Sequence, residues 1–261
     1  MGKIISIVNQ KGGVGKTTST INLAASLGKL KKNILLVDLD PQGNATTGVG
    51  INKGDLNYTI HDVIIGNIDI KKTILKTKEK NFSIIPANID LAGVDIELLK
   101  REQEDNSFLK SMQLKTQLNS IRDNYDFIFI DCPPSLGMLT SNALAASDSV
   151  IIPVQCEFFA LEGIMQLVNT VILTQKNLNP NLDIEGVLLT MYDSRTLLGY
   201  DVIKEIKSYF KERVYDTIIP RNVRLAEAPS HGKSIIAYDL SSKGGDAYMH
   251  LAKEVILRNE K

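Results

Sequence analysis

A glycine-rich segment near the start of the chain has the composition and position of a phosphate-binding loop. Residues 9–18 read Asn-Gln-Lys-Gly-Gly-Val-Gly-Lys-Thr-Thr and lie between an apolar, β-branched run and a helix-forming stretch. Glycines let backbone N–H groups point at an anion, and the positive end of a helix dipole adds to the attraction. In such a loop Lys16 is expected to reach the β- and γ-phosphates of a nucleotide, and the Thr17 hydroxyl to bind Mg²⁺. The residues predicted to contact the nucleotide are Gly12, Gly13, Val14, Gly15, Lys16, Thr17 and Thr18.

Aspartates stand where two other apolar runs end. One run leads into Asp38 and Asp40, and the run Phe127–Asp131 ends in Asp131. A carboxylate at the end of a buried strand is costly unless it has a task. Asp131 is expected to hold the Mg²⁺ shell, and Asp40, in the loop beyond its strand, is expected at the same metal site, near the attacking water. Asp38 leaves two alternatives open: contact with Mg²⁺ through water, or support of the loop.

The elements that position these residues alternate along the chain. Most apolar runs are continuous, which is typical of strands buried on both faces, and helical stretches separate them. The expected fold is therefore α/β, with a mostly parallel central sheet flanked by helices on both faces. Strands are predicted at Ile4–Val8, Ile34–Asp38, Phe82–Pro86, Phe127–Asp131, Val150–Val154, Gly186–Met191 and Tyr215–Ile219. Helices are predicted at Lys16–Leu30, Asp90–Lys100, Phe108–Asp123, Leu161–Asn177, Asp201–Lys211 and Gly245–Arg258.

The fold class also predicts where the chemistry lies. In open parallel sheets, ligands bind beyond the carboxyl ends of the strands. That rule selects the loops after Val8, Asp38, Asp131, Met191 and Ile219, and the glycine-rich loop and the aspartates fall on three of them. The stretch Asn52–Lys80 is less regular, and we expect it at the edge of the sheet.

Length and composition limit the classes of protein. The 261 residues, 43% of them hydrophobic, are enough for one sizeable core, so a single domain over 1–261 is expected. Lys+Arg and Asp+Glu both number 30, so any nucleic-acid site has to be a local patch. Neither a signal peptide nor an apolar run of about 18 residues is visible, which predicts a protein without membrane spans. Cys132 and Cys156 lack metal-ligand spacing and favour a reduced, cytoplasmic location.

One departure in the glycine-rich loop identifies a family. The ordinary motif has glycine six residues before the lysine, whereas this chain has Gln10 there, followed by an additional lysine, Lys11. This resembles the deviant Walker A motif of P-loop NTPases, which the ParA/Soj proteins, MinD, the nitrogenase iron protein and the arsenical pump ATPases share. The resemblance implies an ATPase that binds ATP and Mg²⁺ and forms a homodimer with nucleotide at the interface. It also implies that Lys11 crosses that interface as a catalytic cation, so that ATP binding is tied to dimer formation. The segment around Asp38 and Asp40 resembles the switch I motif of this family, which implies that Asp40 is catalytic and positions or activates the attacking water.

Further segments resemble the ParA/Soj branch over nearly the whole chain. They are 152–163, 190–195 and 219–232, the last reading Ile-Pro-Arg-Asn-Val-Arg-Leu-Ala-Glu-Ala-Pro-Ser-His-Gly. The resemblance implies an adenine pocket bordered by Met191, Pro220, Arg221 and Asn222. It also implies that the ATP-bound dimer binds DNA without sequence preference, through Arg195, Arg221 and Arg224. The expected function is a weak, Mg²⁺-dependent ATPase for chromosome or plasmid partition, associated with the nucleoid and released from DNA when a ParB/Spo0J-like partner stimulates hydrolysis.

Two other functions remain open at this point. A membrane-surface ATPase of the MinD kind needs an amphipathic end, but we expect the apolar face of Gly245–Arg258 to dock on the sheet. A scaffold that uses nucleotide only to dimerise would not turn over. Larger plasmid ParA proteins carry an N-terminal helix-turn-helix domain, and none is expected here because the loop begins at residue 9. The segments around Cys132 and Cys156 do not resemble iron–sulfur cluster segments, so both are expected to be ordinary buried residues.

Overall fold

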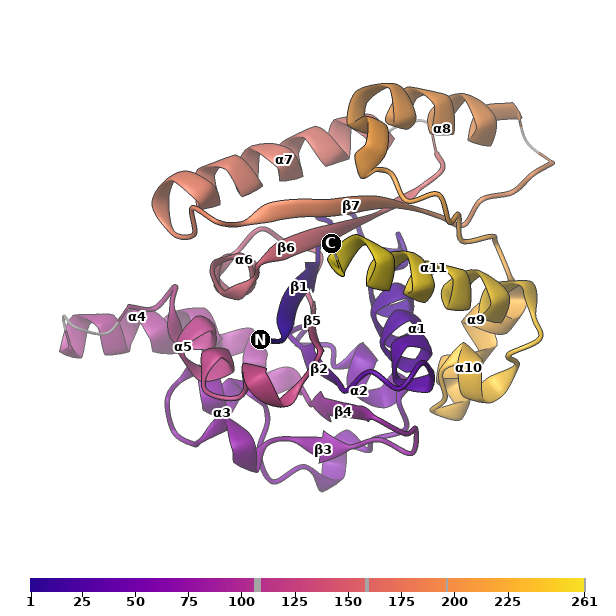
Figure 1. Cartoon of the computed structure of the whole chain (residues 1–261). Helices are drawn as coiled ribbons and strands as arrows, with labels where there is room; N and C mark the ends of the chain where they lie inside the picture. Colours follow the sequence, from indigo (N-terminus) through magenta and orange to yellow (C-terminus); the bar gives the residue numbers. More distant parts are fainter. Residues whose placement is uncertain (106–108, 158–159, 196, 261) are drawn as a thin grey trace.

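The computed structural model describes residues 1–105, 109–157, 160–195 and 197–260. Within them, seven strands form one sheet in the order β3-β4-β2-β5-β1-β6-β7 (Figure 1). The strands are β1 Lys3–Ile7, β2 Ile34–Asp38, β3 Leu75–Lys76, β4 Phe82–Ile85, β5 Phe127–Asp131, β6 Ser149–Gln155 and β7 Asp183–Thr190. All pairs are parallel except β3 with β4, which confirms the predicted mostly parallel sheet.

Helices cover both faces of the sheet (Figure 1). Helices α1, α2, α9, α10 and α11 contribute to the core on one face, and α3 to α8 to the core on the other. The bounds on the first face are α1 Lys16–Lys29, α2 Asn44–Gly48, α9 Val223–Glu227, α10 Ile235–Tyr238 and α11 Lys243–Asn259. On the second they are α3 Ile60–Ile64, α4 Val94–Glu104, α5 Gln113–Asn119, α6 Met138–Ala146, α7 Ala160–Asn177 and α8 Leu197–Phe210.

Strand β5 shows why the apolar runs are continuous. Its side chains alternate between the two faces. Phe127 and Phe129 join the core under α1 and α11, whereas Ile128 and Ile130 join the core under α3 to α8. Since helices bury both faces, both sets of positions have to be apolar.

The segment Tyr215–Ile219 is not a strand, so that prediction was wrong. The segment runs beside β7, where the backbone N–H groups of Tyr215 and Ile219 donate to the carbonyl oxygens of Val187 and Leu189. Between them, the N–H groups of Asp216 and Thr217 donate to the carboxylate of Glu254 on α11, at 2.9 and 3.0 Å. A side chain therefore takes the donors that a continuous ladder needs.

The helix predictions differ from the structure mainly at the ends. The region predicted as Asp90–Lys100 begins as a 3₁₀-helix, Ile89–Gly93, before α4. Of the predicted helix Phe108–Asp123, Phe108 lies outside the described residues, and the rest contains the shorter α5. The stretch Asn52–Lys80 includes α3 and the antiparallel edge strand β3, in line with its expected place at the sheet edge. Among the described residues, no helix is both long and apolar enough to cross a bilayer.

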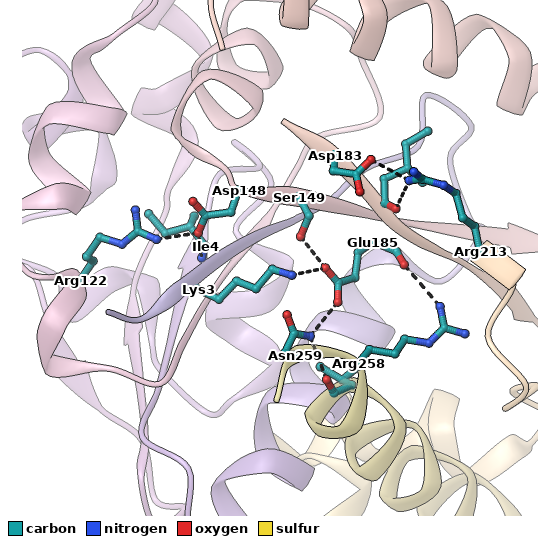
Figure 2. A network of polar contacts seen from close by, with 12 residues as sticks. Lys3, Ile4, Arg122, Asp148, Ser149, Asp183, Glu185, Arg213, Arg258 and Asn259 are labelled. Atoms are coloured by element: carbon teal, nitrogen blue, oxygen red, sulfur yellow. Dashed lines mark hydrogen bonds and ion pairs between the residues drawn. The ribbon is translucent and has the colours of Figure 1, made fainter. Parts of the chain in front are cut away.

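A polar network at the amino ends of three strands ties α11 to the sheet (Figure 2). The side chain of Glu185 on β7 is 5% exposed and pairs with the ammonium group of Lys3 on β1. Its carboxylate also accepts from the Ser149 hydroxyl on β6 and from the Asn259 amide on α11, each at 2.7 Å. Arg258 donates to the backbone of Glu185 at 3.4 Å. One buried carboxylate thus joins β1, β6, β7 and the end of α11.

Replacing Glu185 with alanine is expected to lower the free energy of unfolding by about 2–4 kcal/mol, because several part-buried donors lose their acceptor. Urea denaturation followed by circular dichroism measures this. Asp183→Ala is the matched control, since Asp183 and its partner Arg213 are 64% and 48% exposed in the same network. We expect that variant to lose less than about 1 kcal/mol. Equal losses in the two variants would contradict the role given to burial.

Candidate nucleotide-binding site

The glycine-rich loop follows β1, the strand between β5 and β6 in the sheet, and leads into α1. Gly13 and Gly15 have φ of 76° and 88°, a left-handed conformation that favours glycine. Gly15 is the N-cap of α1, so the helix N-terminus opens onto the loop. Lys16 is 7% exposed, and its ammonium group donates to the carbonyl oxygen of Lys11 at 3.1 Å. Burial lowers the pKa of Lys16, and Asp131 and other nearby acidic groups act against that shift.

Asp131 lies at the end of β5, directly beside α1. Its carboxylate accepts hydrogen bonds from the hydroxyl of Thr17 at 2.7 Å and from that of Thr20 at 2.9 Å. Burial, helped by the charge of Asp38, raises the pKa of Asp131 to about 7. Hydroxyl and carboxylate oxygens are the ligand types that Mg²⁺ takes in proteins. The Thr17–Asp131 pair therefore fits the predicted metal site, and a cation there would offset the cost of the buried charge.

Asp38 and Asp40 have different surroundings although they are two residues apart. Asp38 is fully buried and accepts from Thr46, at 2.8 Å from the backbone N–H and 2.7 Å from the hydroxyl. Burial raises its pKa to about 6. These contacts favour the second alternative for Asp38, support of the loop, over contact with Mg²⁺ through water. Asp40 lies in the loop itself, close enough to Lys16 and Asp131 to influence the pKa of each.

A cavity of about 330 Å³ opens beside the glycine-rich loop. Thr18 and Gly15 line it from the loop, and Thr190 and Tyr248 from β7 and α11. The predicted adenine-pocket residues Met191, Pro220, Arg221 and Asn222 all line this cavity, together with Ile219, Val223, Leu225 and Ala226. Its walls are mainly apolar with a few polar groups, as in sites for flat organic ligands. Phosphate cradle and cavity are contiguous, so one nucleotide could occupy both.

Lys11 does not point into the cavity of its own chain. Its backbone N–H is held by the side chain of Asn9 at 2.9 Å, and its ammonium group pairs with Glu157 at 3.1 Å. The Lys11 and Glu157 side chains are 47% and 50% exposed. An exposed ion pair of this kind contributes little stability and exchanges its partners easily. The cation is therefore available at the surface of the molecule.

The three predicted DNA-binding arginines lie beyond the carboxyl end of β7 and on α9. All are exposed. Arg195 forms two side-chain hydrogen bonds with Asp193, which hold the pKa of that carboxyl well below its usual range, and Arg221 contributes to the shift. Arg224 pairs with Glu227 at 2.9 Å. Arg195 and Arg221 thus lie near one another, and the charges of Arg195 and Arg224 are partly offset by their own neighbours.

Several residues at the site were missed by the sequence analysis. Thr20 is one helical turn after Thr17 and shares its face of α1, so helical spacing could have indicated its bond to Asp131. Thr190 donates to the carbonyl oxygen of Val14 and thereby ties β7 to the glycine-rich loop at 2.8 Å. Tyr248 is 229 residues from Ser19, to which it is hydrogen-bonded at 3.0 Å. No local pattern indicates these long-range pairs.

The two cysteines are free and buried. Burial raises the pKa of both thiols, that of Cys156 to about 11. A raised pKa keeps a thiol protonated, and the thiolate is the form that attacks or binds metals. Both side chains belong to the hydrophobic core on the α3 to α8 face, so their surroundings are those of small apolar residues.

Known proteins are similar to this chain over nearly its full length. A family model described as an AAA domain matches residues 2–184. The chain is 57% identical over 98% of both sequences to the sporulation initiation inhibitor protein Soj of Bacillus subtilis. It is 48% identical to the chromosome partitioning protein ParA of Myxococcus xanthus, over 99% of this chain and 89% of that protein.

Solved structures agree with the fold. Cobyrinic acid a,c-diamide synthase from Mycobacterium smegmatis, with bound ADP and magnesium, matches with a TM-score of 0.85 and 35% identity, over 100% of this chain and 97% of that one. The septum site-determining protein MinD of Pyrococcus horikoshii, complexed with Mg-ADP, matches with a TM-score of 0.78 and 30% identity, over 98% and 96%. Identity is higher for the Soj and ParA proteins, which match almost the whole of this chain, and so the chain belongs to the Soj/ParA family of chromosome-partitioning ATPases.

Proposed function

We propose that this protein hydrolyses ATP to drive DNA partition. The observation that carries the proposal is the group formed by Lys16, Thr17 and Asp131, of which Lys16 and Asp131 are buried, beside a mainly apolar cavity of about 330 Å³. In this arrangement Lys16 neutralises phosphate charge. Relatives that align with nearly the whole of this chain are named chromosome partitioning proteins. The turnover is weak and serves as a timer between two states.

ATP and Mg²⁺ are the proposed cofactors. The glycine-rich loop, residues 12–18, holds the phosphates, and the cavity that Met191, Pro220, Arg221 and Asn222 help to line takes the adenine. Thr17, Asp131 and Asp40 hold the metal and its water shell. Mg²⁺ there supplies charge neutralisation on the phosphates, and Asp40 orients the attacking water. The ADP and magnesium in the related solved structures support this choice.

ATP binding is proposed to bring two copies together through the face that carries Lys11. The Lys11 side chain is about half exposed and its ammonium group forms a surface ion pair with Glu157, a partner that it can exchange for a phosphate of the other copy's nucleotide. A cation supplied in this way links dimerisation to the triphosphate. A ParB-like partner then stimulates hydrolysis and returns the protein to the monomer.

The ATP-bound dimer is proposed to bind DNA through its phosphates and without sequence preference. Arg195, Arg221 and Arg224 are exposed on neighbouring segments at one side of the cavity. Because the net charge of the chain is zero, such a local group, doubled in a dimer, is needed to attract a polyanion. The DNA-bound state corresponds to association with the nucleoid.

DNA binding in ADP, in ATP and with Lys16→Ala, at two salt concentrations, tests the proposal. Binding by the ATP-bound wild type alone, weakened by salt, supports it. Equal affinity for DNA in ADP and in ATP would contradict the proposed nucleotide switch. An absence of DNA binding in every state would contradict the proposed role in partition.

Replacing Arg195, Arg221 and Arg224 with alanine together is expected to weaken DNA binding at least about 100-fold at low salt, because each arginine that binds a phosphate contributes counterion release. The slope of log affinity against log salt should become shallower by about one for each DNA phosphate that is no longer neutralised. Fluorescence anisotropy with labelled duplex DNA measures both quantities. Arg213→Ala is the control, since Arg213 pairs with Asp183 away from the cavity. An unchanged slope in the triple variant would contradict the assignment.

A MinD-like membrane mode is less well supported. The apolar face of α11 packs on the sheet, where Leu251, Ala252 and Val255 are each 0% exposed. Those side chains are therefore unavailable to a lipid surface in this conformation. Sedimentation with anionic liposomes in ATP tests this mode, and ATP-dependent pelleting would favour it over DNA binding.

A further inference from the structure

A single buried carboxylate closes the loop between β2 and α2. Asp38 accepts from the backbone N–H of Asp40 at 3.3 Å and from the backbone N–H of Thr46 at 2.8 Å. It also accepts from the Thr46 hydroxyl at 2.7 Å. That hydroxyl in turn accepts from the backbone N–H of Ala87, beyond β4, at 3.0 Å. Asp38, Thr46 and Ala87 are each 0% exposed, so one hydroxyl links three buried segments.

Asp40 is carried inside this closed loop. Its carboxylate accepts from the backbone N–H of Gln42 at 2.9 Å, and its carbonyl oxygen accepts from that of Gly43 at 2.8 Å. Both bonds join residues of the loop to each other, so they do not fix the position of the loop on the sheet. The bonds at its two ends, Asp38 to Thr46 and Thr46 to Ala87, determine how the loop is placed on the sheet. An error of about 1 Å in the place of a catalytic group costs about 100-fold in rate, so that placement matters for turnover.

We infer that Thr46 is a positioning residue for hydrolysis, whose hydroxyl holds the loop that presents Asp40 to the phosphates. The inference rests on the role of Asp40 in the proposed function. Thr46 is fully buried and cannot touch the nucleotide, so it acts through the loop. It therefore affects turnover while leaving the binding of ADP unchanged. A residue that only stabilised the fold would not separate these two quantities.

The test compares Thr46→Val with Thr46→Ser. Valine keeps the shape but removes both hydrogen bonds of the hydroxyl, and serine restores them. For Thr46→Val we expect kcat to fall about 10-fold while the Kd for ADP stays within about 2-fold, and for Thr46→Ser we expect kcat within about 3-fold of wild type. Thr73→Val is the matched control. Its hydroxyl is also buried and donates to the carbonyl oxygen of Ile70 at 2.7 Å, far from the loop in the chain. We expect Thr73→Val to keep the wild-type kcat although its Tm falls about as far as that of Thr46→Val.

Three outcomes would overturn the inference: an unchanged kcat in Thr46→Val, a parallel loss of ADP affinity, or no recovery in Thr46→Ser. If Thr46→Val does not fold, Thr46→Ala replaces it, because alanine also lacks the hydroxyl that bonds to Asp38 and to Ala87. The same loss of kcat with retained ADP binding is then expected, and its absence refutes the inference. Asp40→Ala distinguishes the proposed role of Asp40 from the positioning role of Thr46. If it hydrolyses normally, the proposed role of Asp40 fails; if it is inactive while Thr46→Val is fully active, only the positioning role fails.

Discussion

Lys16→Ala is expected to lower the rate of ATP hydrolysis by more than about 100-fold, because the cation that meets the phosphate charge is removed from a buried site. Lys16 is 7% exposed and lies over the glycine-rich loop, bonded to the carbonyl oxygen of Lys11. Alanine cannot reach the β- and γ-phosphates from the first position of α1. Phosphate release from purified protein measures hydrolysis, and titration with a fluorescent ATP analogue measures binding.

Lys29→Ala is the matched control for this prediction. Lys29 is at the other end of the same helix and is exposed, so its loss removes one positive charge without changing the site. We expect wild-type hydrolysis from that variant. The assignment of Lys16 would be wrong if Lys16→Ala kept a normal rate while its melting temperature matched the wild type.

Asp40→Ala is expected to reduce hydrolysis about 100-fold or more while nucleotide binding and ATP-dependent dimerisation are kept, because orienting the water contributes only to the chemical step. Asp40 is 8% exposed and belongs to the loop beyond β2, whereas the residues proposed to bind the phosphates belong to the loop beyond β1. The two functions therefore lie on separate segments. Single-turnover hydrolysis and light scattering of the ATP-bound protein measure the two effects.

Asp123→Ala serves as the control for Asp40→Ala. Asp123 is exposed in a short 3₁₀-helix before β5, at the opposite end of the strands from the site. Its replacement should change neither quantity. Loss of dimerisation together with hydrolysis in Asp40→Ala would show that Asp40 supports binding rather than turnover, and would also weaken the proposed timer.

The sequence predicted the sheet well because the signal is local. A run such as Phe127–Asp131 had to be apolar at each position before its terminal aspartate, since helices bury both faces of the sheet. The prediction failed at Tyr215–Ile219, where the Glu254 carboxylate takes the N–H groups of the two polar residues, Asp216 and Thr217. It also missed short elements such as α3 and β3, whose few residues leave little periodicity to detect.

The candidate site also contains residues that local sequence predicts and residues that only the structure places there. The sequence by itself determined the glycine-rich loop, the aspartates at strand ends and the additional Lys11, because each depends on residue types at fixed spacing along one segment. Only the tertiary structure decided that Asp38 supports a loop through Thr46 and that Glu157 holds Lys11. It also decided that Tyr248 and Thr190 line the cavity beside the glycine-rich loop. These interactions join residues far apart in the chain, and their partners are set by how strands and helices pack, which no local pattern records.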